Sequence, residues 1–148
     1  MIEILTQRRR HPDPKVERMR RIPLLADCPP RVLEAIAHLV DEVEVGPGRT
    51  LMREGEIAHE FLVLAEGEAE VRCAEGTVRV LRAGDFAGEL ALLSGGPRTA
   101  TVVTTTPARV LVFTSRAFAQ LVECLPGLSL TMLRVVAGRL ATELPTAA

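Results

Sequence analysis

Glycine is concentrated in the middle third of this chain, and that concentration restricts this stretch to short strands joined by turns. Nine of the eleven glycines lie between positions 46 and 96. Glycine marks turns, and the segments between these turns are rich in β-branched and aliphatic residues. We expect strands at 50–52, 60–64, 68–73, 77–81, 101–105 and 108–113. Strands at this spacing predict an antiparallel β-roll of the jelly-roll type.

The sequence before the glycine-rich segment has helical periodicity instead. Pro30 stands at a favourable first helical position, and apolar residues then recur at helical spacing, so we expect a helix that ends near Val40. A shorter helix is expected over about 15–21. It should stop before Ile22-Pro23, because proline disfavours helical geometry in the residue that precedes it.

Two further helices are expected after the last strand. The first covers about 115–124, with Ser115 as its N-cap, and the second covers about 128–143. The predicted apolar stripe of the second helix comprises Leu133, Val136, Ala137, Leu140 and Leu144. The predicted fold class is therefore mainly β with flanking helices, α+β, with N-terminal helices and two C-terminal helices around the roll.

At 148 residues, the chain has room for one domain. We divide it into a basic arm over 1–14 and a domain over 15–146, with the β-roll at about 43–113. A net charge of −1 and the lack of Trp and Tyr argue against direct nucleic-acid binding. The three cysteines form no CxxC pair, and no stretch reads as a signal peptide or membrane span. A cytoplasmic location is expected.

Segment 84–102 contains the residue types that an anion site needs. Gly88 precedes a short helix expected over 89–93, whose first N–H groups favour a phosphate. Arg98 supplies a permanently charged fork for two phosphate oxygens. Glu89 is unfavourable beside a phosphate unless it accepts a hydrogen bond from a hydroxyl group, such as a ribose 2′-OH, or pairs with Arg98. Taken singly, these residues also fit a capped helix with a Glu89–Arg98 ion pair.

As a continuous string, this segment resembles the phosphate-binding cassette of cyclic nucleotide-binding domains. It reads Phe86-x-Gly-Glu-Leu-Ala-Leu-Leu, then Pro97-Arg-Thr-Ala-Thr-Val. The likeness continues upstream through Gly48-x-x-Leu51-x-x-Glu54-Gly55-Glu56 and Phe61-Leu62-Val63-Leu64-x-x-Gly67, and it covers about residues 15–143. Domains of this family regulate cyclic-nucleotide-dependent kinases, gated channels and bacterial regulators of the catabolite-activator type.

The resemblance implies a site for a cyclic nucleotide, with cAMP or cGMP as the ligand. Glu89 is expected to accept the ribose 2′-OH, and Arg98 to pair with the cyclic phosphate. The remaining implied site residues are Gly88, Leu90, Thr99 and Ala100 around the phosphate, Leu62, Leu64, Val71 and Leu81 in the pocket lining, and Met132, Leu133 and Val136 in a lid. Thr99 leaves cGMP open, because family members with Thr at this position can hydrogen-bond a guanine amino group.

No enzyme chemistry can be assembled from this sequence, because its three histidines are scattered and match no metal or nucleophile pattern. We therefore expect a regulatory domain, without cofactor or metal, that repositions its C-terminal helices when ligand binds. The alternative is a degenerate β-roll used for protein–protein contact without nucleotide. The output is expected from an effector protein or a missing output domain, in a bacterial-type stand-alone sensor or a channel-derived piece. The sequence is also compatible with a homodimer.

Overall fold

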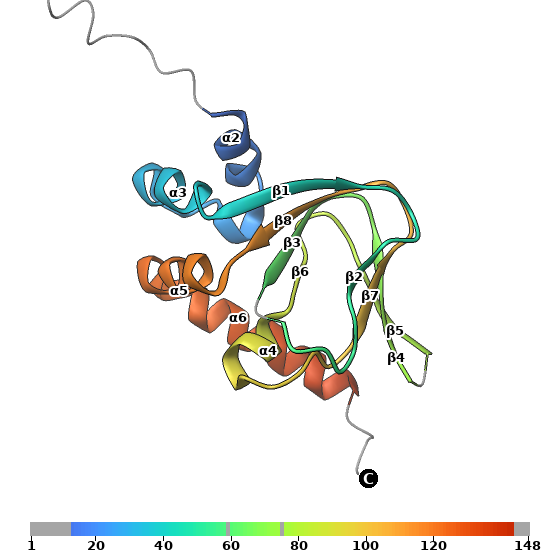
Figure 1. Cartoon of the computed structure of the whole chain (residues 1–148). Helices are drawn as coiled ribbons and strands as arrows, with labels where there is room; N and C mark the ends of the chain where they lie inside the picture. Colours follow the sequence, from blue (N-terminus) through green and yellow to red (C-terminus); the bar gives the residue numbers. More distant parts are fainter. Residues whose placement is uncertain (1–12, 59, 75, 144–148) are drawn as a thin grey trace, which may run out of the picture.

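Two antiparallel sheets of four strands form the centre of the fold, and helices gather at one end of them (Figure 1). The computed structural model describes residues 13–58, 60–74 and 76–143. The helices are α2 (Pro14–Arg20), the 3-10 turn η1 (Pro23–Leu25), α3 (Pro30–Ala37), α4 (Glu89–Ser94), α5 (Ser115–Cys124) and α6 (Pro126–Glu143). The strands are β1 (Val40–Val45), β2 (Thr50–Met52), β3 (Phe61–Glu66), β4 (Ala69–Cys73), β5 (Gly76–Leu81), β6 (Phe86–Ala87), β7 (Thr101–Thr104) and β8 (Ala108–Phe113).

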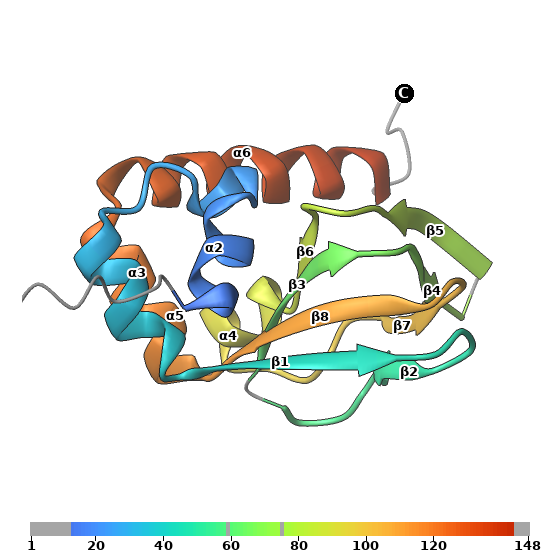
Figure 2. The same cartoon turned by 90° about the horizontal axis from the view of Figure 1, so that it is seen from above.

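The two sheets face each other, and together they confirm the predicted β-roll with flanking helices. One sheet has the order β1-β8-β3-β6 and the other β2-β7-β4-β5. Helices α2, α3 and α5 lie together at one end of the strands, and α6 runs alongside (Figure 2). Segment 84–102, which holds the residues of the expected anion site, thus runs from β6, at the edge of one sheet, to β7, in the interior of the other.

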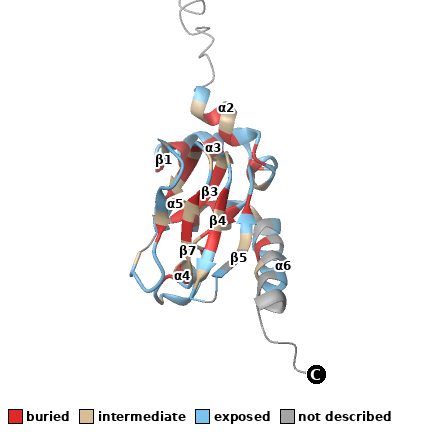
Figure 3. Ribbon diagram, turned by 90° about the vertical axis from the view of Figure 1, so that its right-hand side faces the viewer, coloured by how far each residue is buried: buried red, intermediate tan, exposed pale blue. Residues whose placement is uncertain are grey.

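Strand β3 shows why the roll has two apolar cores. Its first four residues are all buried, and neighbours along the strand point to opposite faces. Phe61 and Val63 pack with the helices, whereas Leu62 and Leu64 pack between the two sheets. Figure 3 shows the buried residues following β3 and β4 through the middle of the molecule. The continuous apolar run in the sequence therefore serves two layers at once.

The structure corrects the expected end of the helix before the roll. Helix α3 ends at Ala37, and Val40 is the first residue of β1 rather than the last of the helix. The stretch from Val40 to Val45 consists of three valines and three acidic residues, and it pairs with β8 at all six positions. The valine at position 40 continued the helical spacing by coincidence, which hid this strand. The two-residue strand β6 was also not expected.

The C-terminal helices differ in detail from the expectation. Thr114, not Ser115, is the N-cap of α5, because the Thr114 hydroxyl accepts the hydrogen bond from the N–H of Ala117. Helix α6 begins at Pro126, two residues earlier than expected.

The apolar stripe expected on α6 is wrong at Leu133 and Ala137. Met132 is buried in the core shared with the helices and Val136 is half-buried, whereas Leu133 is 64% exposed and Ala137 is exposed. The side chain of Leu140 and all of Leu144 lie outside the described part of the chain, as does the arm up to residue 12.

Candidate functional site

Gly88 stands at the point where β6 ends and α4 begins, and its position requires glycine. Strand β6 pairs with β3, with Ala87 opposite Leu62, which brings Gly88 beside the start of β3. The φ angle of Gly88 is +96°, in the left-handed region that side chains disfavour. A Cβ on Gly88 would lie 2.7 Å from the carbonyl oxygen of Glu60 and 2.8 Å from Nη1 of Arg98. The missing side chain therefore makes room for an arginine.

Arg98 fills that room, and the protein holds its guanidinium mainly through backbone carbonyls. Nη2 donates to the carbonyl oxygen of Glu60 at 2.7 Å, and Nη1 donates to that of Gly88 at 3.4 Å. The backbone N–H of Arg98 donates to the carbonyl of Glu56 at 2.9 Å, which fixes the approach of the chain. Arg98 is only 5% exposed, and its buried Nε has no hydrogen-bond partner among the residues that the structure describes. One donor of the fork thus remains for a further acceptor.

The charges around Arg98 are unusual for a protein interior. Burial lowers the pKa of Arg98, opposed by the negative charges of Glu60 and, to a smaller extent, Glu89. Glu89 is the first residue of α4 and is 2% exposed. Burying charged groups costs free energy unless partners compensate for it. The site therefore keeps a buried arginine and a buried glutamate close enough to interact electrostatically.

An apolar pocket lies between the two sheets, beside β6. Three of the four predicted lining residues, Leu62, Leu64 and Leu81, are among those that form its wall, whereas Val71 is buried in the same core but does not line it. The other lining residues are Leu51, Ala69, Asp85, Ala87, Val102 and Val110. The cavity volume is about 10 Å³, roughly the room of one water molecule. A larger group has to stay at the mouth or move the lining side chains.

The other predicted site residues are distributed around this centre. Leu90 lies in the first turn of α4, the side chain of Thr99 is exposed, and Ala100 is partly buried beside the inter-sheet core. Of the three predicted lid residues, Met132 is buried among the helices, Leu133 is exposed and Val136 is half-buried. Helix α6 contributes no residue to the pocket wall described above, so the lid stays a prediction.

Sequence reasoning missed two residues at the site, Met52 beside Gly88 and Glu60 beside Arg98. Met52 Cε lies 2.9 Å from the place of a Cβ on Gly88, and the Glu60 carboxylate oxygen Oε2 lies 3.5 Å from Arg98 Nη2. Both residues reach the site only through strand pairing, and no local motif marks either of them. Among residues 13–58, 60–74 and 76–143, no group of three or more His, Cys, Asp or Glu side chains could hold a metal ion. No helix in these ranges is both long enough and apolar enough to cross a membrane.

Sequence relatives include regulatory subunits and an enzyme. The cAMP-dependent protein kinase regulatory subunit of Colletotrichum orbiculare is 36% identical over 112 residues, which are 74% of this chain and 29% of that protein. The Acetyltransferase Pat of Mycolicibacterium smegmatis is 36% identical over 118 residues, which are 77% of this chain and 35% of that protein. The chain thus spans about a third of the length of either relative.

Solved structures share the fold. The structure titled "cAMP bound PfPKA-R (141-441)" superposes with a TM-score of 0.76 at 23% identity, over 86% of this chain and 44% of that one. "Sp-2Cl-cAMPS bound to PKAR CBD2" gives a TM-score of 0.74 at 22% identity, over 90% of this chain and 94% of that one. The family profile described as "Cyclic nucleotide-binding domain" matches residues 42–123. The resemblance seen in the cassette is confirmed: this chain belongs to the cyclic nucleotide-binding domain family.

Proposed function

We propose that this domain binds a cyclic nucleotide, with cAMP as the first candidate, and acts as a regulatory sensor. The observation that carries the proposal is the state of Arg98, whose guanidinium is buried and held by two carbonyls, with an Nε for which the described part of the chain supplies no acceptor. Leaving a buried charged donor unsatisfied is costly. A phosphate on this fork supplies both the missing acceptor and a compensating charge.

The surrounding residues fit the rest of such a ligand. Glu89 supplies a buried carboxylate that accepts a hydrogen bond from a ribose hydroxyl. Gly88 keeps the backbone beside Arg98 free of side-chain atoms. The pocket behind Ala87 offers an apolar wall for a base. Because its cavity is small, binding moves lining side chains or holds the base at the mouth, and such a movement is one route to the C-terminal helices.

The choice of cAMP follows the Colletotrichum orbiculare regulatory subunit and the two solved structures, whose names mention cAMP or a cAMP analogue. Thr99, exposed and next to Arg98 in the chain, keeps cGMP as a second ligand to test. The output of the sensor lies in an effector protein or in a further domain, in line with a kinase and an acetyltransferase among the relatives' names. The three free cysteines suit a reducing compartment, so we place this function in the cytoplasm.

Titration calorimetry with cAMP and with cGMP tests the proposal. The wild-type chain should bind at least one of them at micromolar concentrations. Arg98→Leu should weaken that binding about 100-fold or more, because charge-assisted hydrogen bonds to a buried arginine contribute about 1.5–3 kcal/mol each. Arg53→Leu is the matched control, since Arg53 is exposed and its ion pair is with Glu56.

Two results contradict the proposal. One is no heat from the wild-type chain at millimolar nucleotide, which favours the alternative of a β-roll that serves only for protein contact. The other is Arg98→Leu binding as tightly as the wild type, which removes Arg98 from the site.

A further inference from the structure

Glu60 is a carboxylate at the site that the cassette motif does not include. It directly precedes β3, and it contacts Arg98 twice. Its carbonyl oxygen accepts from Nη2 at 2.7 Å, and its carboxylate Oε2 lies 3.5 Å from the same nitrogen. The side chain of Glu60 is 51% exposed, whereas that of Arg98 is buried. The buried cation thus faces a carboxylate on its solvent side.

The geometry of the guanidinium decides where a ligand anion can bind. Nε and Nη2 form one edge of the fork, and a bidentate anion needs both donors of an edge. Nε has no hydrogen-bond partner within residues 13–58, 60–74 and 76–143, so this edge has capacity left for an acceptor. Its second donor, Nη2, already faces the Glu60 carboxylate. An anion that enters this edge therefore meets Glu60.

The charges at the site also indicate that Glu60 opposes a bound anion. Arg98 contributes one positive charge, and Glu60 and Glu89 contribute one negative charge each. Both carboxylates raise the pKa of Arg98, against the effect of burial, and Glu60 contributes more than Glu89. Glu89 has a place in the proposed ligand contacts through the ribose, whereas Glu60 has none.

We propose that Glu60 is an internal counter-ion of Arg98 that competes with the ligand phosphate and lowers the affinity of the site. This inference rests on the proposed function of Arg98 as the phosphate ligand. Without ligand, Glu60 reduces the cost of a buried cation. With ligand, its negative charge repels the phosphate. For two charges about 6 Å apart at an effective dielectric constant of about 40–80, Coulomb's law predicts roughly a 3- to 10-fold effect on affinity.

The test compares Glu60→Gln with Glu56→Gln by calorimetry. Glu56 is the matched control, because its exposed side chain pairs with Arg53 rather than Arg98, and the substitution keeps the backbone carbonyl that accepts from the Arg98 N–H. Glu60→Gln should bind cAMP about 3- to 10-fold more tightly than wild type at low salt, and the gain should shrink in high salt. Glu56→Gln should stay within about 1.5-fold. Adenosine, which lacks the phosphate, should bind both variants as it binds wild type.

An unchanged or weaker affinity of Glu60→Gln for cAMP overturns the proposal, since the carboxylate then orients Arg98 or has no effect. A gain that adenosine shows equally also overturns it, because the effect is then not on the anion.

A second probe separates this proposal from the proposed function. Inorganic phosphate is titrated into the labelled chain, and the Nε–H resonance of Arg98 is followed by NMR. Tighter phosphate binding by Glu60→Gln than by wild type supports the counter-ion role, even if neither chain binds cAMP. Equal or undetectable phosphate binding in both chains, with no nucleotide binding, overturns both proposals together.

Discussion

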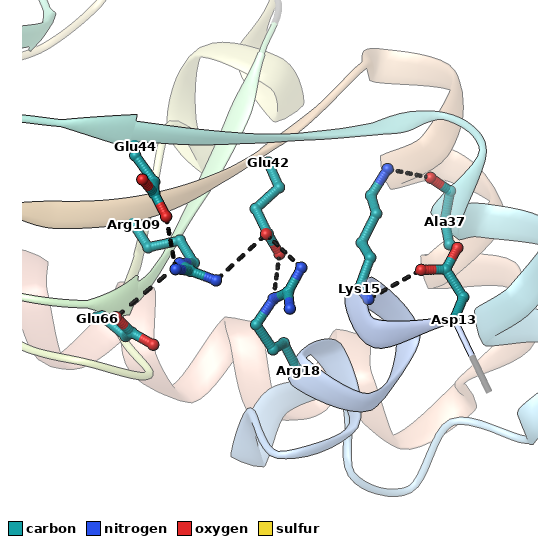
Figure 4. Close-up of polar contacts among 8 residues, drawn as sticks. All are labelled: Asp13, Lys15, Arg18, Ala37, Glu42, Glu44, Glu66 and Arg109. Carbon is teal, nitrogen blue, oxygen red and sulfur yellow. Dashed lines mark hydrogen bonds and ion pairs between the residues drawn. The ribbon is translucent and has the colours of Figure 1, made fainter. Parts of the chain in front are cut away.

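Arg98 and Arg109 are both arginines with carboxylate neighbours, and the protein treats them differently. Arg109, on β8, lies among Glu44 at 2.6 Å, Glu42 at 3.4 Å and Glu66 at 3.9 Å. Figure 4 shows this cluster, with Arg18 of α2 on the other side of Glu42. Because Ala108 and Val110, the neighbours of Arg109 along β8, pack between the sheets, Arg109 points to the opposite, outer face of its sheet. Arg98 has carbonyls and one carboxylate at 3.5 Å. The Nε of either arginine is buried without a hydrogen-bond partner among the described residues, but three carboxylates compensate the charge of Arg109, whereas Arg98 has only one carboxylate beside its carbonyls and so keeps more capacity for an anion.

The largest expected effect separates the two arginines by ligand binding. Arg98→Leu should reduce cAMP affinity about 100-fold, because it removes the charged donors of the site. Arg109→Leu should leave that affinity within about twofold, since its partners lie on the outer face, and should lower the free energy of unfolding instead. Calorimetry and urea unfolding of both variants provide the check. Equal losses of affinity in the two variants would contradict the distinction.

Gly88 gives the next largest effect, on stability and binding together. Gly88→Ala combines a strained φ of +96° with close contacts to Glu60 and Arg98, so we expect a loss of about 2–3 kcal/mol in the free energy of unfolding. Gly55→Ala is the control, because its φ is +84° but nothing lies within 4 Å of the added Cβ. It should cost only about 1 kcal/mol. Urea unfolding measures the loss of unfolding free energy in both variants. Gly88→Ala should also weaken cAMP binding. An equal loss in the two variants would show that the close contacts with Glu60 and Arg98 add nothing to the strain in φ.

Glu42 tests the structural side of the comparison. It accepts hydrogen bonds from Arg18 at 2.6 and 2.8 Å and from Arg109 at 3.4 Å, so it connects α2 to β1 and β8. Glu42→Gln should lower the urea midpoint by about 0.5 M and leave cAMP affinity unchanged. Glu44→Gln, at an exposed carboxylate that pairs with Arg109, should lower the midpoint less. A change in affinity would show that the outer face is coupled to the site.

The sequence predicted the surroundings of Arg98 better than those of Arg109. Gly88, Glu89 and Arg98 lie within eleven residues, so their grouping is local and visible in the chain. Glu60 reaches Arg98 only because β3 pairs with β6. The Arg109 cluster likewise depends on pairing of β1 with β8, and β1 itself was hidden by the helical spacing of Val40. Glycine spacing predicted the strands, but not which side chains the pairing brings together.

The N-cap of α5 shows the same limit at the smallest scale, because Thr114 and Ser115 are both good N-cap residues and sequence alone chose the wrong one. Thr114 follows β8, and its hydroxyl accepts from the Ala117 N–H at 3.1 Å. Thr114→Ala should therefore cost about 1 kcal/mol of unfolding free energy, and Ser115→Ala, in the first helical turn, less than about 0.3 kcal/mol. Thermal or urea unfolding distinguishes them. A larger loss from Ser115→Ala than from Thr114→Ala would mean that Ser115 is the N-cap. Neither variant should alter cAMP affinity, because neither residue belongs to the candidate site.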